Sequence, residues 1–136
     1  MIPEIPRRGS TAAARASLAY RFGLPYDPFS QDWEWEVADP ARFDEFVDAY
    51  VSGVLDEDER LALMEMLIQC VEDLDLPSLA SSPQWHSVAT LLLTHSGLHA
   101  NSVRYWSCLG ERDLENCFRV SSPMRGLWKV IGRDEP

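Results

Sequence analysis

Histidines are the residues in this chain with the most specific potential chemistry, because neutral imidazoles bind zinc. His95 and His99 stand four residues apart, a spacing that places two imidazoles on one face of a helix, and His86 lies upstream. Gly97 stands between the pair, so we expect the helix to end there. The two imidazoles would then not share one helix face. No further ligands accompany these histidines. The sequence therefore predicts neither a metal site nor another cofactor.

Pairs of acidic residues offer a second kind of chemistry. Asp44 with Asp48, and Glu65 with Asp73, could hold a hard cation or act as acid and base if their carboxyl groups had fixed, unequal environments. The sequence contains no calcium-binding loop and no Glu-x-x-His motif to fix such a geometry. We interpret these acids as solvated helix faces. A small carboxylate- or metal-dependent enzyme stays as an alternative.

Motifs for nucleophilic catalysis and phosphate binding are absent from the sequence. There is no Gly-x-Ser-x-Gly elbow and no glycine-rich phosphate loop, so we expect the protein not to be an enzyme. Cys70, Cys108 and Cys117 form no Cys-x-x-Cys pair, and an odd number without a secretory signal indicates reduced thiols in the cytoplasm. Cys108 and Cys117 could face each other across a hairpin, but a disulfide is not expected there.

The most distinctive feature of the chain is a concentration of acidic residues between positions 32 and 75. This segment holds fifteen aspartates and glutamates against two arginines, whereas residues 1–31 carry four bases against two acids and residues 76–136 carry six against five. The net charge of −10 therefore originates in one third of the chain. Such a surface repels nucleic acid and attracts a basic protein. No apolar run approaches the length of a membrane span.

Aromatic residues are interleaved with these acids. Residues 32–37 alternate between acidic and apolar side chains, which predicts a short extended segment with Trp33 and Trp35 inward and the carboxylates outward, or else a single helical turn. Carboxylates beside aromatic anchors suit the capture of a basic partner, although the tryptophans could equally be core residues. The candidate partner-binding residues are Trp33, Glu34, Trp35, Glu36, Asp44, Glu45, Asp48, Asp56, Glu57 and Asp58.

Helices must position most of these side chains. Capping residues followed by apolar stripes at helical spacing predict helices over residues 11–22, 40–52, 57–75, 83–95 and 123–131. Strand-forming residues over 102–109 and 116–121 suggest a small C-terminal β-hairpin. The predicted fold class is therefore mainly α, or α+β if the hairpin forms. We expect residues 1–136 to form a single domain, a bundle of four to five helices. We expect residues 1–9 to be a flexible arm and residues 133–136 to be frayed.

The segment 57–75 is apolar over more than half of its helical circumference. Leu63, Met66 and Cys70 lie beyond a normal amphipathic stripe, which predicts the central core helix. In a second alternative, a homodimer mate covers this helix. The chain would then be a self-associating subunit or adaptor with an exposed apolar strip.

The run Gln31-Asp32-Trp33-Glu34-Trp35-Glu36-Val37-Ala38-Asp39, in a small, acidic, mainly helical chain, resembles the small immunity proteins encoded beside bacterial polymorphic toxins. The resemblance implies stoichiometric inhibition, in which the protein binds a cognate toxin, often a basic nuclease, and blocks its active site with carboxylates that mimic phosphate. It provides no motif by which a functional residue could be transferred. We therefore expect a non-catalytic, cytoplasmic, acidic protein that sequesters or inhibits a basic protein partner.

Overall fold

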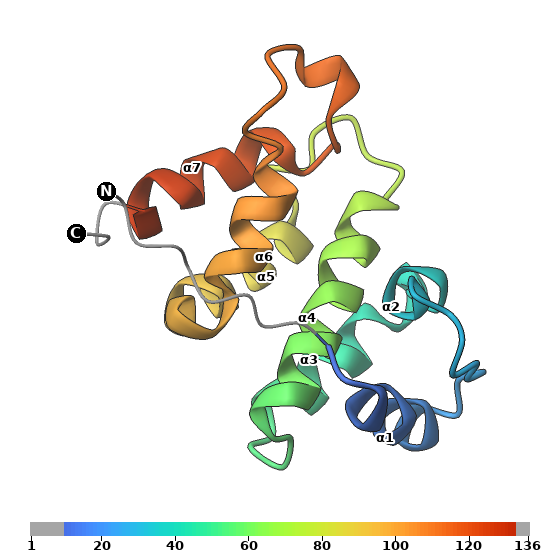
Figure 1. Ribbon diagram of the computed structural model, residues 1–136. Helices are drawn as coiled ribbons and strands as arrows, with labels where there is room; N and C mark the ends of the chain where they lie inside the picture. The colour runs from blue at the N-terminus through green and yellow to red at the C-terminus, as the bar shows by residue number, and fades with distance from the viewer. Residues whose placement is uncertain (1–9, 133–136) are drawn as a thin grey trace. The chain divides into compact units, whose positions relative to one another are not determined.

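The computed structural model describes residues 10–132 of the chain, and the regular secondary structure in that range is all helical (Figure 1). Seven α-helices and two short 3-10 helices are joined by turns, and none of the described residues forms a strand. The mainly helical prediction is confirmed, and the predicted hairpin is wrong. The predictions for residues 1–9 and 133–136 fall outside the described residues.

The described residues divide into two compact units, which we call the N-terminal unit (residues 10–74) and the C-terminal unit (residues 75–132). The single domain expected from length and composition stays a prediction. The helices of the N-terminal unit are α1 (Ala12–Phe22), α2 (Trp33–Glu36), the 3-10 helix η1 (Pro40–Arg42), α3 (Phe43–Val51) and α4 (Glu57–Glu72). Each of α1, α2 and α3 packs against α4, which is the central helix of this unit (Figure 1).

The ends of these helices follow the capping chemistry in the sequence. Thr11 accepts a hydrogen bond from the Ala14 amide and caps α1, which begins at Ala12, one residue later than predicted. Gly23 ends α1 with a φ of 64°, a left-handed conformation that glycine adopts without a steric penalty. Asp56 and Glu59 form a capping box at the start of α4, which begins at Glu57 as predicted. That helix ends at Glu72, three residues earlier than predicted.

Burial on α4 agrees with its predicted role in the core. Leu63, Met66 and Cys70, which lie beyond a normal amphipathic stripe, are all fully buried. A homodimer through this helix would require them on an exposed strip. These three residues therefore do not form the exposed apolar strip that the self-association alternative requires.

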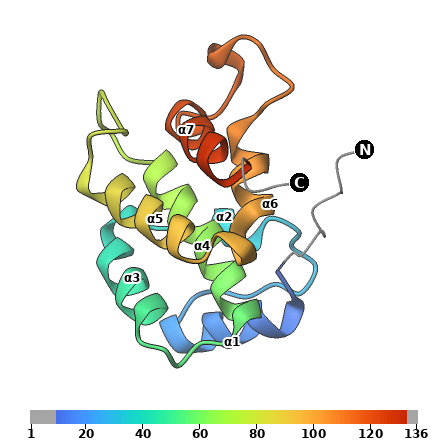
Figure 2. The same ribbon diagram turned by 90° about the vertical axis from the view of Figure 1, so that its left-hand side faces the viewer.

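The C-terminal unit contains α5 (Pro83–Thr94), α6 (Ser96–Ser107), the 3-10 helix η2 (Leu114–Asn116) and α7 (Ser121–Ile131). Helix α6 packs most extensively on α7, and α5 contacts both (Figure 2). Ser82 accepts a hydrogen bond from the Trp85 amide and begins α5, as predicted. The prediction that Gly97 ends this helix is wrong, because α6 begins at Ser96 and Gly97 lies in its first turn.

The segment predicted to be the first hairpin strand is instead the second half of α6. His99, Ser102, Val103 and Trp106 recur at helical spacing and are all buried. Two of these four side chains are polar, so the helical period is invisible when only apolar residues are counted. Packing of this stripe overrides the strand propensity of the local sequence.

None of the helices in residues 10–132 combines the length and hydropathy needed to cross a membrane.

Two buried groups on α3 and α4 should make the fold sensitive to alkali. Burial raises the pKa of the Tyr50 hydroxyl and of the Cys70 thiol to about 12, from ordinary values of 10.0 and 9.0. The unfolded chain then releases these protons at lower pH than the folded chain, so the free energy of unfolding falls as pH rises above about 9. Each group contributes a slope of at most about 1.4 kcal/mol per pH unit.

Urea unfolding at several pH values between 8 and 11 measures this slope. The variants Tyr50→Phe and Cys70→Ala each remove one titrating group and should flatten the dependence of the unfolding free energy on pH. An unchanged slope in both variants would contradict the assignment.

Candidate partner-binding site

The tryptophan-rich segment at residues 32–37 forms one helical turn, so the extended segment predicted from its alternation is wrong. Helix α2 directs two adjacent residues, Trp33 and Glu34, into the interior, where they are only 2% and 5% exposed. Trp35 is half-buried and Glu36 is exposed. An extended segment would have separated the tryptophans from the acids, whereas the helical turn buries one residue of each kind.

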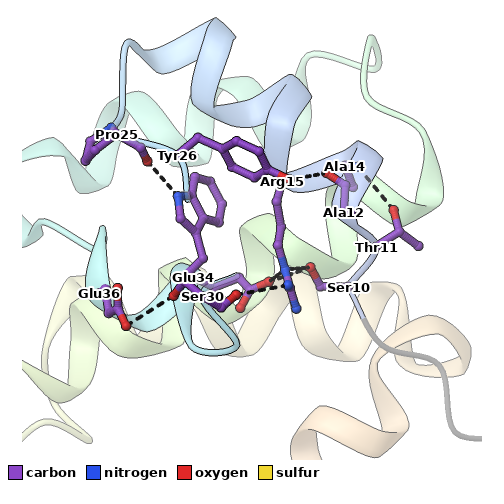
Figure 3. Close-up of polar contacts among 11 residues, drawn as sticks. Ser10, Thr11, Ala12, Ala14, Arg15, Pro25, Tyr26, Ser30, Glu34 and Glu36 are labelled. Carbon is purple, nitrogen blue, oxygen red and sulfur yellow. Dashed lines mark hydrogen bonds and ion pairs between the residues drawn. The ribbon is translucent and has the colours of Figure 1, made fainter. Parts of the chain in front are cut away.

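Trp33 is a core residue. Its indole Nε1 donates a hydrogen bond to the Pro25 carbonyl oxygen at 2.7 Å, and its ring meets the Tyr26 ring edge-on at a centroid distance of 6.3 Å. These contacts fasten the turn after α1 to α2 (Figure 3). Because its ring is buried, Trp33 is not part of an exposed partner-binding surface.

Glu34 also has a structural role. Its Oε1 lies 2.5 Å from Nε of Arg15 on α1 and accepts a hydrogen bond from the Ser10 hydroxyl. Arg15 in turn donates to the Ser30 carbonyl oxygen at 3.4 Å, so one ion pair ties α1 to α2 and to the preceding loop (Figure 3). An arginine of the first helix thus pairs with a glutamate of the acidic segment. Glu34 therefore has no free carboxylate to offer a partner.

Helix α3 presents acids outward. Asp44 and Asp48, four residues apart, are exposed, and neither has a hydrogen-bond or ion-pair partner within residues 10–132. Val47 and Val51 continue the same face at positions i+3 and i+7 from Asp44, and Val51 is 61% exposed. We call Asp44, Val47, Asp48 and Val51 the α3 stripe. It combines unpaired carboxylates with accessible apolar surface.

Glu45 lies beside the stripe but is already paired. Arg42 donates to both of its carboxylate oxygens, at 2.8 Å and 2.9 Å, and these hydrogen bonds hold the pKa of Glu45 below its ordinary value. The same guanidinium donates to the Phe22 carbonyl oxygen at 2.8 Å and lies over the Phe46 ring. Glu45 thus helps to hold Arg42 against α1 and adds little free negative charge.

The acids at the start of α4 divide between capping and exposure. Asp56 accepts a hydrogen bond from the Glu59 amide at 2.7 Å, and the Glu59 carboxylate accepts one from the Asp56 amide at 3.1 Å. Glu57 is exposed and Asp58 is half-buried. These carboxylates interact favourably with the positive end of the α4 dipole. This stabilisation of the helix is sufficient to explain why acids stand at these positions.

Two exposed aromatic residues are not among the candidates that the sequence predicts. Phe29 is 90% exposed and Tyr20 is 92% exposed, both in the N-terminal unit. The Asp27 carboxylate accepts a hydrogen bond from the Phe29 amide at 2.9 Å, which closes a tight turn. The sequence signal was the Asp27-Pro28-Phe29 turn, because a bulky residue in such a turn has little core within reach.

The excess of negative charge lies in the N-terminal unit. Residues 10–74 hold fifteen acids against four arginines, whereas residues 75–132 hold four acids against five bases. The candidates predicted from the sequence therefore separate into a buried pair, Trp33 and Glu34, and a remainder that is exposed or half-buried. Within that remainder, Asp44 and Asp48 are exposed and have no partner among residues 10–132.

Metal binding finds no support in the described part of the chain, where no three potential ligand side chains are grouped. No protein-family model, curated protein or solved structure matches the chain.

Proposed function

We propose that this protein is a non-catalytic acidic binding protein that sequesters or inhibits a basic protein partner, with the α3 stripe at the centre of its contact surface. The observation that supports this proposal is the exposure of Asp44 and Asp48 without partners. They lie in a unit with almost four times as many acids as bases, where most other carboxylates have a hydrogen-bond or salt-bridge partner.

Charge and apolar surface have different tasks in this proposal. The negative field of the N-terminal unit attracts a basic protein over a distance of about a Debye length, which raises the rate of encounter. Val47 and Val51, in the stripe itself, then exclude water around the carboxylates of Asp44 and Asp48. Desolvated charge pairs of this kind slow dissociation more than exposed pairs at the rim do.

In its specific form, the proposal is that the partner is a toxin and that this protein is the matching immunity protein. The support for this form is the resemblance of residues 31–39 together with the acidity of the unit that contains them. Carboxylates that occupy the phosphate-binding positions of a nuclease would block its active site directly.

The charge-reversal variant Asp44→Lys/Asp48→Lys tests the proposal. Tagged wild-type and variant proteins are used to capture partners from lysate of the source organism, and the captured protein is identified by mass spectrometry and purified. Its affinity for the variant should be about 100-fold lower than for the wild type, since two favourable charge contacts become repulsive. Both residues are exposed, so the unfolding free energy should change by less than about 0.5 kcal/mol.

The matched control is Asp75→Lys/Glu115→Lys, which changes the net charge equally at two exposed acids of the C-terminal unit. This control should bind within about threefold of the wild type at physiological salt, because neither residue belongs to the α3 stripe and exposed charges act over only about a Debye length. If both variants lose affinity equally, net charge alone governs binding and the α3 stripe is not the site. If neither loses affinity, the acidic contact surface is wrong.

A further inference from the structure

The loop between α6 and α7 brings two cysteines together. Cys108 follows the last residue of α6, and Cys117 follows η2. The Cys117 sulfur lies 3.8 Å from the Cys108 carbonyl oxygen, and the Cys108 side chain is close enough to influence the pKa of the Cys117 thiol. The sequence placed these residues across a hairpin. The structure has no hairpin in this segment and brings them together by a different route.

The backbone conformation of the loop brings Cys108 and Cys117 together. Cys108 has a φ of 55° and ends α6 in the left-handed conformation, which turns the chain back sharply. Among the described residues other than glycine, it is the one with a positive φ. Asp113 then accepts a hydrogen bond from the Glu115 amide at 3.0 Å and begins η2. Cys117 follows this 3-10 helix and lies beside Cys108.

Arg125 on α7 holds the returning loop in place. Its guanidinium donates to the carbonyl oxygens of Ser107 and Cys108, both at 2.7 Å, and of Glu111 at 2.8 Å. Its Nη2 also lies 3.5 Å from the Cys117 sulfur. One cation therefore fixes the backbone of one cysteine and contacts the thiol of the other.

The three cysteines of the chain differ in accessibility. Cys108 and Cys117 are half-buried at the surface, whereas Cys70 is fully buried in the other unit. Burial and the neighbouring Cys108 thiol raise the pKa of Cys117, and the Arg125 charge opposes that rise. A small reagent can thus reach the paired thiols and not the isolated one.

We propose that Cys108 and Cys117 form a dithiol modification site, which a low-molecular-weight disulfide such as oxidised glutathione converts to an intramolecular disulfide. One thiol loses its proton and attacks a sulfur of oxidised glutathione, forming a mixed disulfide and releasing one glutathione thiolate. The second thiol, also deprotonated, attacks the protein sulfur of that mixed disulfide and releases the second glutathione. The protein loses two protons and two electrons, and oxidised glutathione becomes two reduced molecules.

Ring closure is favoured because the second thiol is already in place. A thiol held beside the mixed disulfide attacks at a high effective concentration, so the mixed form does not accumulate. The product links the two ends of the loop that Arg125 already holds, and it covalently constrains the connection from α6 to α7.

Incubation of the full-length protein with oxidised glutathione, followed by intact-mass measurement and peptide mapping, tests this proposal. The wild type should lose the mass of two hydrogen atoms, carry no glutathione and yield a peptide that links Cys108 to Cys117. Cys108→Ser and Cys117→Ser should each instead retain one glutathione on the remaining cysteine of the pair. Cys70→Ala, the control for the third thiol, should react as the wild type does.

Four outcomes would overturn the site. The wild type could keep glutathione on either cysteine as a stable mixed disulfide, or it could stay fully reduced while a free thiol reagent labels both residues. It could also link through Cys70 or between two molecules. Each result would show that the two thiols are not arranged for ring closure.

Discussion

Replacing Trp33 by alanine is expected to lower the free energy of unfolding by about 3–5 kcal/mol. The ring is 2% exposed, and alanine leaves a large cavity against α4 that the surrounding helices can only partly fill. The substitution also removes the indole donor, so the Pro25 carbonyl oxygen loses a hydrogen bond of 2.7 Å. Urea unfolding followed by circular dichroism measures the loss.

Trp35→Ala is the matched control for this prediction. The two tryptophans lie in the same helical turn, but Trp35 is half-buried, so its removal should cost clearly less. Trp33→Phe separates the two contributions of the indole, since it retains most of the apolar volume and removes only the donor. A loss below about 1 kcal/mol for Trp33→Ala would mean that the ring is not in the core.

Removing the carboxylate of Glu34 should destabilise the protein nearly as strongly. Glu34→Ala leaves Arg15 without its ionic partner, and breaking a buried pair in this way costs about 3–5 kcal/mol. The Arg15 side chain is 21% exposed and can regain some hydration, so we expect about 3 kcal/mol, near the lower end of that range. The unfolding free energy in urea is again the quantity measured.

The double variant Arg15→Leu/Glu34→Leu completes the test. Because it removes both charges together, it should recover much of the stability that Glu34→Ala loses. Glu45→Gln serves as the exposed comparison. Its partner Arg42 is at a similar distance but the pair is solvated, so the loss should stay below about 1 kcal/mol. Equal losses for Glu34→Ala and Glu45→Gln would contradict the structural role given to Glu34.

These two predictions also separate folding from binding. Trp33 and Glu34 are buried, so variants there would weaken any activity through loss of the folded state. Asp44 and Asp48 can be changed without that complication. Binding experiments should therefore use the α3 stripe, with folding of each variant checked first.

Local chemistry in the sequence predicted most of the helices. The capping box at Asp56–Glu59, the Ser82-Pro83 start and the apolar stripe of residues 43–51 each specify a helix through contacts within a few residues. Such contacts form wherever the segment is placed, so they can be read from the chain alone. The same holds for the location of the negative charge, which the sequence places in residues 32–75.

Tertiary packing decided the rest. Alternation in residues 32–37 was compatible with a strand or a helical turn, and packing of α2 on α4 selected the turn that buries Trp33 beside Glu34. A buried stripe containing His99 and Ser102 likewise selected the helix α6 over the hairpin. Whether a carboxylate is free or paired depends on a partner such as Arg15, nineteen positions from Glu34. The sequence by itself thus determined where most helices begin and where the acidic residues are concentrated. Long-range contacts alone decided which acids reach solvent, because burial depends on residues far apart in the chain.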